Sequence, residues 1–289
     1  MKFNLLIFGD NSKMSINDIL ICPVCKSPLC REERSYFCDG AKKHCFDISA
    51  TGHVNLYPGR ASGGDDKKAV KSRTDFLSLG LYAPLAQKLC ELLSAYPMEK
   101  AVIDAGCGEG YYSNMIAAET GISVLGFDLS KEAIISASKS AKRQGITNAH
   151  FFVGGIYDLP VADGRADAVI NIFAPCAEGE FCRVLKDGGR LIVVGAGKNH
   201  LLGLKRAIYE EAYTNEPRAD MPTSMKLLQK FNLSYTIELD GEENIRNLFS
   251  MTPYSYRTSA KDMQKLLALA HLETEVDFDV FVYEKEGSI

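Results

Sequence analysis

The 289-residue chain is 46% hydrophobic and 24% charged, with a net charge of −4. This length and composition predict a globular protein with room for a full α/β core and a small second module. No apolar run is long enough for a transmembrane helix. The start, Met1 to Phe8, lacks the basic leader and the cleavage site of a signal peptide.

Charge is distributed unevenly along the chain. Residues 20–75 carry ten Lys or Arg and seven Asp or Glu, whereas the acidic excess lies in the rest of the chain. This asymmetry favours an anionic partner for the first module. A solvated surface with a chance imbalance accounts for it equally well.

The nine cysteines are also unevenly placed. Five of them fall within 24 residues: Cys22, Cys25, Cys30, Cys38 and Cys45. An odd count with one tight cluster, in a chain with no visible export signal, indicates metal binding rather than disulfides. We therefore expect a protein of a reducing compartment, the cytoplasm.

The spacing C-x2-C-x12-C-x5-H is typical of a structural zinc site. The residues that fit it are Cys22, Cys25, Cys38 and His44. A CxxC turn places two thiolates side by side, and a second pair across a short hairpin completes a tetrahedron. Four protein ligands leave no open position, so Zn²⁺ would stabilise a module too small to rely on its own core. Cys45, next to His44, is an alternative fourth ligand, and Cys30 is a weaker one.

The elements expected along the chain indicate two units. Residues 15–58 read as short strands and turns, followed by a polar break at 61–66 and by helical spacing over 67–94, interrupted near Gly80 and Pro84. Strands are then expected at 101–105, 122–127, 149–154, 167–173 and 190–195, with helices at 111–119, 130–143 and 177–185. This alternation predicts an α/β, Rossmann-like sheet.

The regular alternation of predicted strands and helices ends after residue 198. We expect a helix near 200–214, a loop with Pro217 and Pro222, a further helix, a strand at 234–239, a helix at 259–270 and a last strand at 273–283. This finish favours an antiparallel edge on a mostly parallel sheet. The predicted domains are a zinc-binding module (15–60), a helical lead-in (61–98) and a nucleoside-binding domain (99–289).

Residues 102–112 carry the strongest motif. A buried strand leads into Gly106, Gly108 and Gly110, and a second strand ends at Asp128. A glycine turn followed by an acid at the end of the next strand is how a Rossmann-type sheet holds a nucleoside. Asp104, just before the turn, would be badly placed beside a pyrophosphate but suits an ammonium group. The pattern resembles motif I of the S-adenosylmethionine-dependent methyltransferases.

A set of short strings in a fixed order resembles one family within this class. The strings are HCFD at 44–47, GHVNL at 52–56, FL at 76–77, GLYAPL at 80–85, FAPC at 173–176, NHL at 199–201, Lys205, IY at 208–209 and MTP at 251–253. Together with the zinc motif and residues 104–112 they resemble the RlmA-type 23S rRNA (guanine-N1)-methyltransferases. The resemblance extends from about residue 20 to the C-terminus.

The resemblance implies S-adenosylmethionine as methyl donor, structural Zn²⁺, and a hairpin loop of 23S rRNA as substrate and partner. It also implies that a homodimer is one expected state. The cofactor contacts that it and motif I predict are Tyr82, Asp104, Gly106, Gly108, Glu109, Gly110, Tyr111, Asp128, Leu129 and His200. For Tyr82 and His200 only the resemblance supports this role, because an apolar helix face and an exposed loop explain them without a ligand.

Substrate-facing residues are expected after the fourth strand of the core. The candidates are Asn171, Phe173 and Pro175, and Phe173 has the ring to stack on a base; alternatively, it simply ends a buried strand. No residue identifies itself as a general base, although Asp158 is one candidate. Two other functions remain open: a small-molecule methyltransferase with a structural zinc module, and an RNA-binding protein whose methyltransferase core is inactive.

Overall fold

The computed structural model describes residues 18–59, 64–97, 99, 101–256 and 258–287. Met1 to Phe8 and residues 61–63 of the polar break lie outside this description. None of the helices in the described part of the chain combines the length and apolar character that a membrane crossing needs.

A small antiparallel module comes first. Its strands pair in the order β1-β2-β3. The elements before the glycine turn are β1 (Leu29–Glu32), β2 (Ser35–Cys38), β3 (Cys45–Asp47), β4 (Val54–Asn55), α1 (Lys67–Ser78), α2 (Ala83–Ser94) and β5 (Val102–Ala105). The helical spacing over 67–94 therefore forms two helices, separated near Gly80 as expected.

The rest of the chain builds the main sheet and its cover. It comprises α3 (Tyr111–Thr120), β6 (Val124–Asp128), α4 (Lys131–Gln144), β7 (Ala149–Val153), β8 (Ala166–Ile172), α5 (Glu178–Val184), β9 (Leu185–Ala196), α6 (Leu202–Ile208), β10 (Lys226–Asp240), α7 (Glu242–Ser250), α8 (Ala260–Leu267) and β11 (His271–Glu284). A short 3₁₀ turn, Pro253–Tyr256, follows α7.

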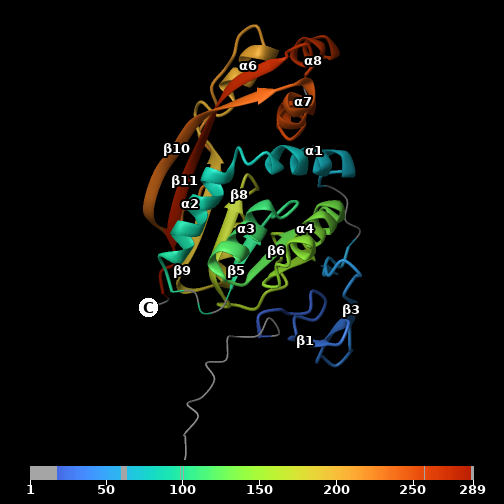
Figure 1. Ribbon diagram of the computed structural model, residues 1–289. Helices are drawn as coiled ribbons and strands as arrows, with labels where there is room; N and C mark the ends of the chain where they lie inside the picture. Colours follow the sequence, from blue (N-terminus) through green and yellow to red (C-terminus); the bar gives the residue numbers. More distant parts are fainter. Residues whose placement is uncertain (1–17, 60–63, 98, 100, 257, 288–289) are drawn as a thin grey trace, which may run out of the picture.

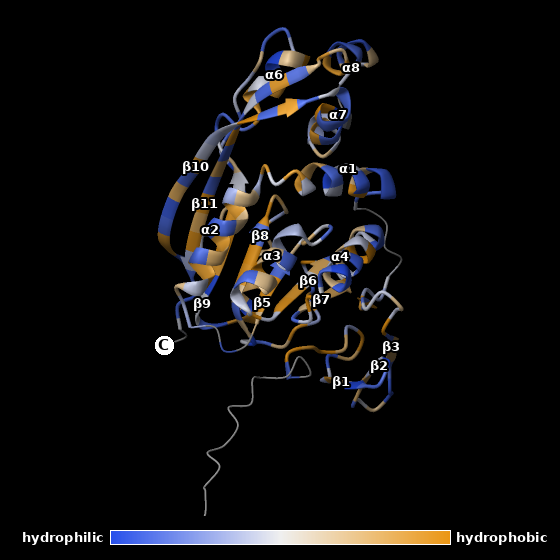
Figure 2. Cartoon of the chain, in the orientation of Figure 1, coloured by the Kyte–Doolittle hydropathy of each residue, from blue (hydrophilic) through white to orange (hydrophobic). Residues whose placement is uncertain are grey.

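The main sheet has the order β10-β11-β9-β8-β5-β6-β7-β4. The strands from β9 to β4 run parallel. β11 pairs antiparallel with β9, and β10 pairs antiparallel with β11, which confirms the predicted antiparallel edge. β5 lies between β6 and β8. The chain continues from β5 to β6 and β7 on one side and then crosses back to β8 on the other side of β5. A sheet of this kind binds ligands at such a point, beyond the carboxyl ends of its strands. Figure 2 shows the apolar residues that make up β5, β6 and β8.

The expected helix between Pro222 and residue 234 is wrong. Residues 226–234 belong to β10, a single 15-residue strand that pairs along its length with the 14-residue β11. Leu227, Leu228 and Phe231 have helical spacing, but the long antiparallel ladder overrides that local signal, as tertiary pairing often does. The sequence reading also missed α7, which buries Ile245, Leu248 and Phe249.

The two larger hydrophobic cores of the described residues lie on opposite faces of the sheet, and a smaller cluster lies under α4. Along β5, Val102 belongs to the core formed with α1, α2, α3 and α7, and Ile103 belongs to the other. That second core contains Phe181 and Val184 of α5 together with residues of the first module, including Leu20, Leu29 and Leu56. The module thus covers part of a face that doubly wound folds cover with helices.

Backbone pairing joins the same module to the sheet. β4 pairs in parallel with β7, matching Val54 to Phe152, and Leu20 bridges Val161. The backbone N–H of Leu56 donates to the Val153 carbonyl at 2.9 Å. In Figure 1 the blue β1–β3 module lies at the end of the molecule opposite α7 and α8. Residues 18–56, which contain β1–β4 and which we call the ribbon, are therefore held directly against the sheet.

Candidate active site

The glycine turn follows β5 and leads directly into α3. Gly106 has φ +89°, and a Cβ there would lie 2.6 Å from the Cβ of Ala174. Only glycine combines that backbone conformation with so close an approach. The N–H groups of Gly106 and Cys107 donate to the Phe127 carbonyl at 2.8 and 3.0 Å, which fixes the turn at the end of β6.

Two aspartates stand at the ends of β5 and β6. Asp104 is 2% exposed and accepts a hydrogen bond from the Ser113 hydroxyl at 2.5 Å, and burial raises its pKa to about 7. Asp128 accepts from the N–H of Gly108 at 3.0 Å and from that of Ser130 at 2.7 Å. Burial also raises the pKa of Asp128, although these two N–H groups oppose the shift. The aspartates are thus held rigidly and are largely removed from water.

A third buried acid, Glu109, faces α1. Burial raises its pKa to about 7, and the nearby Arg73 opposes the shift. Arg73 Nη1 lies 3.7 Å from Glu109 Oε2, and the same guanidinium pairs with Asp65. Glu109 Oε2 has no hydrogen-bond partner within the described residues. Arg73 is one of the ten Lys or Arg counted over residues 20–75, and the sequence did not predict that α1 would bring it to the glycine turn.

These groups line a cavity of about 960 Å³ at the carboxyl ends of the central strands. The predicted site residues that line it are Tyr82, Asp104, Gly106, Gly108, Glu109, Asp128, Leu129, Phe173, Pro175 and His200. Gly110, Tyr111 and Asn171 are not among its lining residues. Met251, Thr252 and Pro253, from one of the family strings, also line it.

His200 contributes a neutral imidazole to the cavity wall. Burial lowers its pKa to about 4. Its Nδ1 accepts a hydrogen bond from the Asp277 backbone N–H at 3.2 Å, so in the neutral ring the proton is on Nε2. The ring centroid lies 5.6 Å from that of Phe173 and 6.3 Å from that of Tyr82. His200 near neutral pH is therefore a hydrogen-bond donor through Nε2, not an acid.

Tyr82 lies directly before α2 and is 1% exposed. Its ring packs edge-on against Phe76 and Phe278, with centroid separations of 5.1 and 5.0 Å. Its hydroxyl has no hydrogen-bond partner among the described residues. Since a buried unpaired hydroxyl costs about 1–3 kcal/mol, this group is suited to meet a ligand.

Phe173 and Asn171, both predicted to face substrate, have different surroundings. Phe173 is 47% exposed and has φ +53°, a strained conformation for a residue with a side chain. Asn171 is fully buried, and its amide donates to the carbonyls of Ala105 and Pro175 at 3.1 Å each. Asn171 therefore supports the loop that presents Phe173.

The loop after α6 closes one side of the cavity, and the sequence reading did not assign it a role. Arg218 donates to Asn171 Oδ1 at 3.1 Å and to the Ala174 carbonyl at 2.5 Å. Asp220 accepts from the N–H of Cys176 at 2.8 Å, and the hydrogen bond from Arg218 lowers the pKa of Asp220 to about 2. An Arg–Asp pair two residues apart gives no sequence signal of such a long-range contact.

Lys205 anchors the other end of that loop. It is fully buried and donates to the Tyr213 carbonyl at 3.1 Å and to Asn215 Oδ1 at 2.6 Å. Asn215 donates in turn to the carbonyls of Gly197 and His200 at 2.8 and 3.2 Å. Lys205 thus fixes Asn215, which lines the cavity.

The ribbon brings the four predicted zinc ligands together. One ligand atom from each of Cys22, Cys25, Cys38 and His44 lies within 4.8 Å of all the others. The Sγ atoms of Cys25 and Cys38 are 3.6 Å apart, and His44 Nδ1 lies 3.6 Å from Cys22 Sγ and 3.4 Å from Cys38 Sγ. Tetrahedral Zn²⁺ with bonds of about 2.3 Å requires sulfurs about 3.8 Å apart, so the donor set and its spacing fit the ion.

Two alternatives from the sequence have other surroundings. Cys45 is exposed and its Sγ lies 3.8 Å from Asp47 Oδ1. Asp158, the candidate base, is 66% exposed and pairs with Lys26 of the ribbon at 2.6 Å, and it does not line the cavity. It therefore contributes to the attachment of the ribbon.

The cavity fits a nucleoside with a cationic group. It combines buried carboxyl groups, an unpaired Tyr82 hydroxyl and a glycine turn that permits close approach, and its volume lies within the usual range for cofactor sites. An S-adenosylmethionine molecule, with its ammonium and sulfonium charges, has this chemistry. Fold and site together define a Rossmann-like, class I methyltransferase with an attached zinc ribbon.

Comparison with known proteins agrees with this class of protein. Residues 98–241 match a family model described as a methyltransferase domain, and residues 20–62 match one described as the RlmA N-terminal zinc ribbon. A Bacillus subtilis (strain 168) protein, provisionally named 23S rRNA (guanine-N(1)-)-methyltransferase YxjB, is 29% identical over 90% of this chain and 95% of its own length.

Two further relatives match about two thirds of the chain. The 23S rRNA (guanine(748)-N(1))-methyltransferase of Streptomyces fradiae is 32% identical over 65% of this chain and 67% of its own length. A provisionally named enzyme of the same kind from Micromonospora griseorubida is 32% identical over 64% and 68%. The chain belongs to the RlmA-type family of 23S rRNA (guanine-N1)-methyltransferases.

The glycine turn gives a first prediction. In Gly106→Ala the added Cβ meets Ala174 in a conformation that alanine avoids, so we expect affinity for S-adenosylmethionine to fall by about 100-fold. The measurement is calorimetric titration. Gly145→Ala is the matched control, because Gly145 also has positive φ but no atom within 4 Å of its Cβ position, and affinity should stay within about twofold. Equal losses in both variants would contradict the assigned role.

The ribbon gives a second prediction, which separates His44 from its neighbour. His44→Ala removes a donor from the cluster, so the purified protein should lose its zinc, whereas Cys45→Ala should retain about one zinc per chain. Elemental analysis after dialysis measures both. Zinc that remains in His44→Ala and disappears from Cys45→Ala would assign the fourth ligand to Cys45 instead.

Proposed function

We propose that this chain transfers the methyl group of S-adenosylmethionine to N1 of a guanine in a hairpin loop of 23S rRNA. The observation that carries the proposal is the combination, in one chain, of the acidic nucleoside cavity with the ribbon that the RlmA family model matches. The Streptomyces fradiae relative is named for guanine-N1 methylation of 23S rRNA, and the other two relatives are provisionally named for the same reaction. A small-molecule methyltransferase would not need the ribbon.

For the cofactor, we propose that the predicted contacts around the glycine turn act as a unit. The Asp104 carboxylate is positioned for the ammonium group, and Asp128 for the ribose hydroxyls. Tyr82 and His200 supply a hydroxyl and an Nε2–H from the opposite wall. Gly110 and Tyr111 were predicted as cofactor contacts but do not line the cavity, so we assign them to the backbone and packing of the turn. We propose Zn²⁺ as a structural ion on Cys22, Cys25, Cys38 and His44.

When bound, S-adenosylmethionine supplies an electrophilic methyl group on a positively charged sulfur. Transfer would be an in-line displacement, in which the N1–carbon bond would form as the sulfur–carbon bond breaks. The sulfur would leave as a neutral thioether, and the N1 proton would pass to solvent water. The protein's main contribution is to hold the guanine on the sulfur–methyl axis, and N1 must also lose its proton before or during transfer, because the protonated nitrogen is a poor nucleophile. The half-exposed ring of Phe173, held by Asn171 and Arg218, is the proposed stacking surface for that base.

Guanine N1 lies on the Watson–Crick edge, so a paired guanine cannot react. An unpaired base of a hairpin loop is accessible, and proteins that read RNA by sequence target such loops. We therefore assign the loop, rather than a helix, as the target.

We propose the cytoplasm as the location of the protein. For the domains, we propose residues 15–60 as the zinc-binding module, 61–98 as the lead-in and 99–289 as the methyltransferase domain.

Primer extension on unmodified 23S rRNA tests the function. Enzyme with S-adenosylmethionine should produce a reverse-transcription stop at one loop guanine, because N1-methylguanine cannot pair. Phe173→Ala should slow transfer by about fivefold to 100-fold, the cost of a lost stacking contact, while affinity for S-adenosylmethionine stays within about twofold.

The control variant is Leu228→Ala, on the exposed surface of β10, which should leave both the stop and the rate unchanged. If the rRNA shows no stop and methyl groups are incorporated into a small-metabolite extract, the protein is a small-molecule methyltransferase and the proposal is wrong. Failure to bind S-adenosylmethionine would leave an inactive RNA-binding protein.

A further inference from the structure

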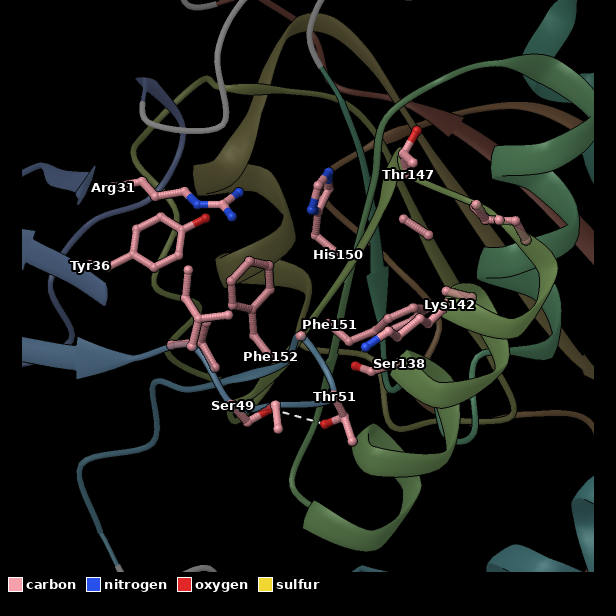
Figure 3. Close-up of a pocket in the computed structure, with 18 residues that line it drawn as sticks. Arg31, Tyr36, Ser49, Thr51, Ser138, Lys142, Thr147, His150, Phe151 and Phe152 are labelled. Carbon is pink, nitrogen blue, oxygen red and sulfur yellow. Dashed lines mark hydrogen bonds between the residues drawn. The ribbon is translucent and has the colours of Figure 1, made fainter. Parts of the chain in front are cut away.

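A second cavity lies between the ribbon and the outer edge of the main sheet. It has a volume of about 380 Å³ and shares no lining residue with the acidic cavity. Figure 3 shows Arg31 and Tyr36 of the ribbon on one side, His150 on β7 in the middle and Lys142 on α4 on the other side. It lies near the amino end of β7 and the last turn of α4, away from the carboxyl ends of the strands.

The lining is apolar inside and basic at the rim. Tyr36, Phe151 and Phe152 are each at most 4% exposed. The Phe152 ring stacks on Phe127, with the centroids 5.1 Å apart, so these rings close the inner end of the cavity and belong to the core. The side chains of Arg31 and Lys142 are at the exposed rim, and no Asp or Glu lines the cavity. The cavity therefore has a closed apolar floor and positive charge at its opening.

Two uncharged polar groups complete the lining. Ser138 is 5% exposed, and its hydroxyl has no hydrogen-bond partner within the described residues. Burial, with a contribution from Arg31, lowers the pKa of His150 to about 4, so its ring is neutral and carries one donor and one acceptor. An unpaired buried hydroxyl that lines a cavity is the kind of group that a ligand satisfies.

We propose that this cavity binds one unpaired nucleotide of the RNA substrate, with the backbone phosphates of that segment beside the rim cations Arg31 and Lys142. The inference rests on the proposed function for the identity of the RNA. The unpaired Ser138 hydroxyl supplies a hydrogen bond to the nucleotide. The volume lies near the lower end of the range for small-ligand sites, which suits one nucleotide, and phosphate contacts from Lys and Arg supply much of the affinity of proteins for nucleic acids.

The position of the cavity explains why the ribbon is fixed on the sheet. One wall comes from the ribbon and the other from α4 and β7, so the site exists only while the two are joined. A nucleotide held there anchors the RNA at a fixed distance from the cavity that holds the methyl donor. The pairing of β4 with β7 sets that distance.

Paired charge removals test the phosphate contacts. The variant Arg31→Ala/Lys142→Ala should bind an unmodified 23S rRNA transcript about tenfold more weakly than the native protein in filter binding, with a shallower salt dependence. The matched control is Lys139→Ala/Arg143→Ala, which removes two exposed cations of α4 that do not line the cavity, and it should change affinity by about twofold or less. Equal losses in the two variants would overturn the proposal.

Ser138→Ala tests the site without removing charge. Loss of an unpaired buried hydroxyl in a helix should leave the melting temperature unchanged or higher. We expect RNA affinity to fall by about threefold or more in the same variant. Native RNA affinity in Ser138→Ala would identify the cavity as a packing void and overturn the proposal.

The readouts separate this inference from the proposed function. If rRNA binds through the cavity but no N1 methylation follows, the proposed function fails and the inference stands. If methylation proceeds and both sets of variants bind rRNA normally, the inference fails alone. Free guanosine monophosphate is the remaining probe. If it binds the native protein but not Ser138→Ala, while Ser138→Ala keeps native affinity for rRNA, the occupant of the cavity is a free nucleotide. That result would overturn the proposal.

Discussion

The burial of Asp104, Glu109 and Asp128 at the carboxyl edge of a parallel sheet is the constraint on which the rest of the structure depends. One arginine, Arg73, lies beside these acids, and its guanidinium also forms an ion pair with Asp65. Since burial raises the pKa of Asp104 and of Glu109 to about 7, the folded protein keeps protons that the unfolded chain loses at lower pH. The free protein therefore loses stability as pH rises from about 4 to 7, and a cationic cofactor offsets that cost.

The ribbon depends on the same sheet for different reasons. Its apolar residues belong to the core that also contains Ile103 and Phe181, and β4 adds an eighth strand beside β7. A zinc module of this size has little core of its own, so the ion fixes its internal turns while the sheet supplies the buried area. This arrangement gives a fixed relation between the ribbon and the cavity of the glycine turn.

Local patterns predicted much of this molecule. The glycine turn, the acids at 104 and 128, the zinc spacing and the alternation of strands and helices up to β9 all depend on residues close in sequence. Contacts between distant segments could not be predicted this way: Arg218 meets Asn171, and Lys205 fixes the loop through Asn215. The same limit explains the wrong helix after Pro222, since β10 owes its length to its partner β11.

Calorimetric titration with S-adenosylmethionine across the titration range of the buried acids tests the central claim most directly. If Asp104 must ionise to hold the ammonium group, affinity should be about tenfold weaker near pH 6 than near pH 8, as a pKa of about 7 requires. In Asp104→Asn the affinity should be low and nearly independent of pH. A native affinity that does not change over this range, or a variant that keeps the full dependence, would contradict the account.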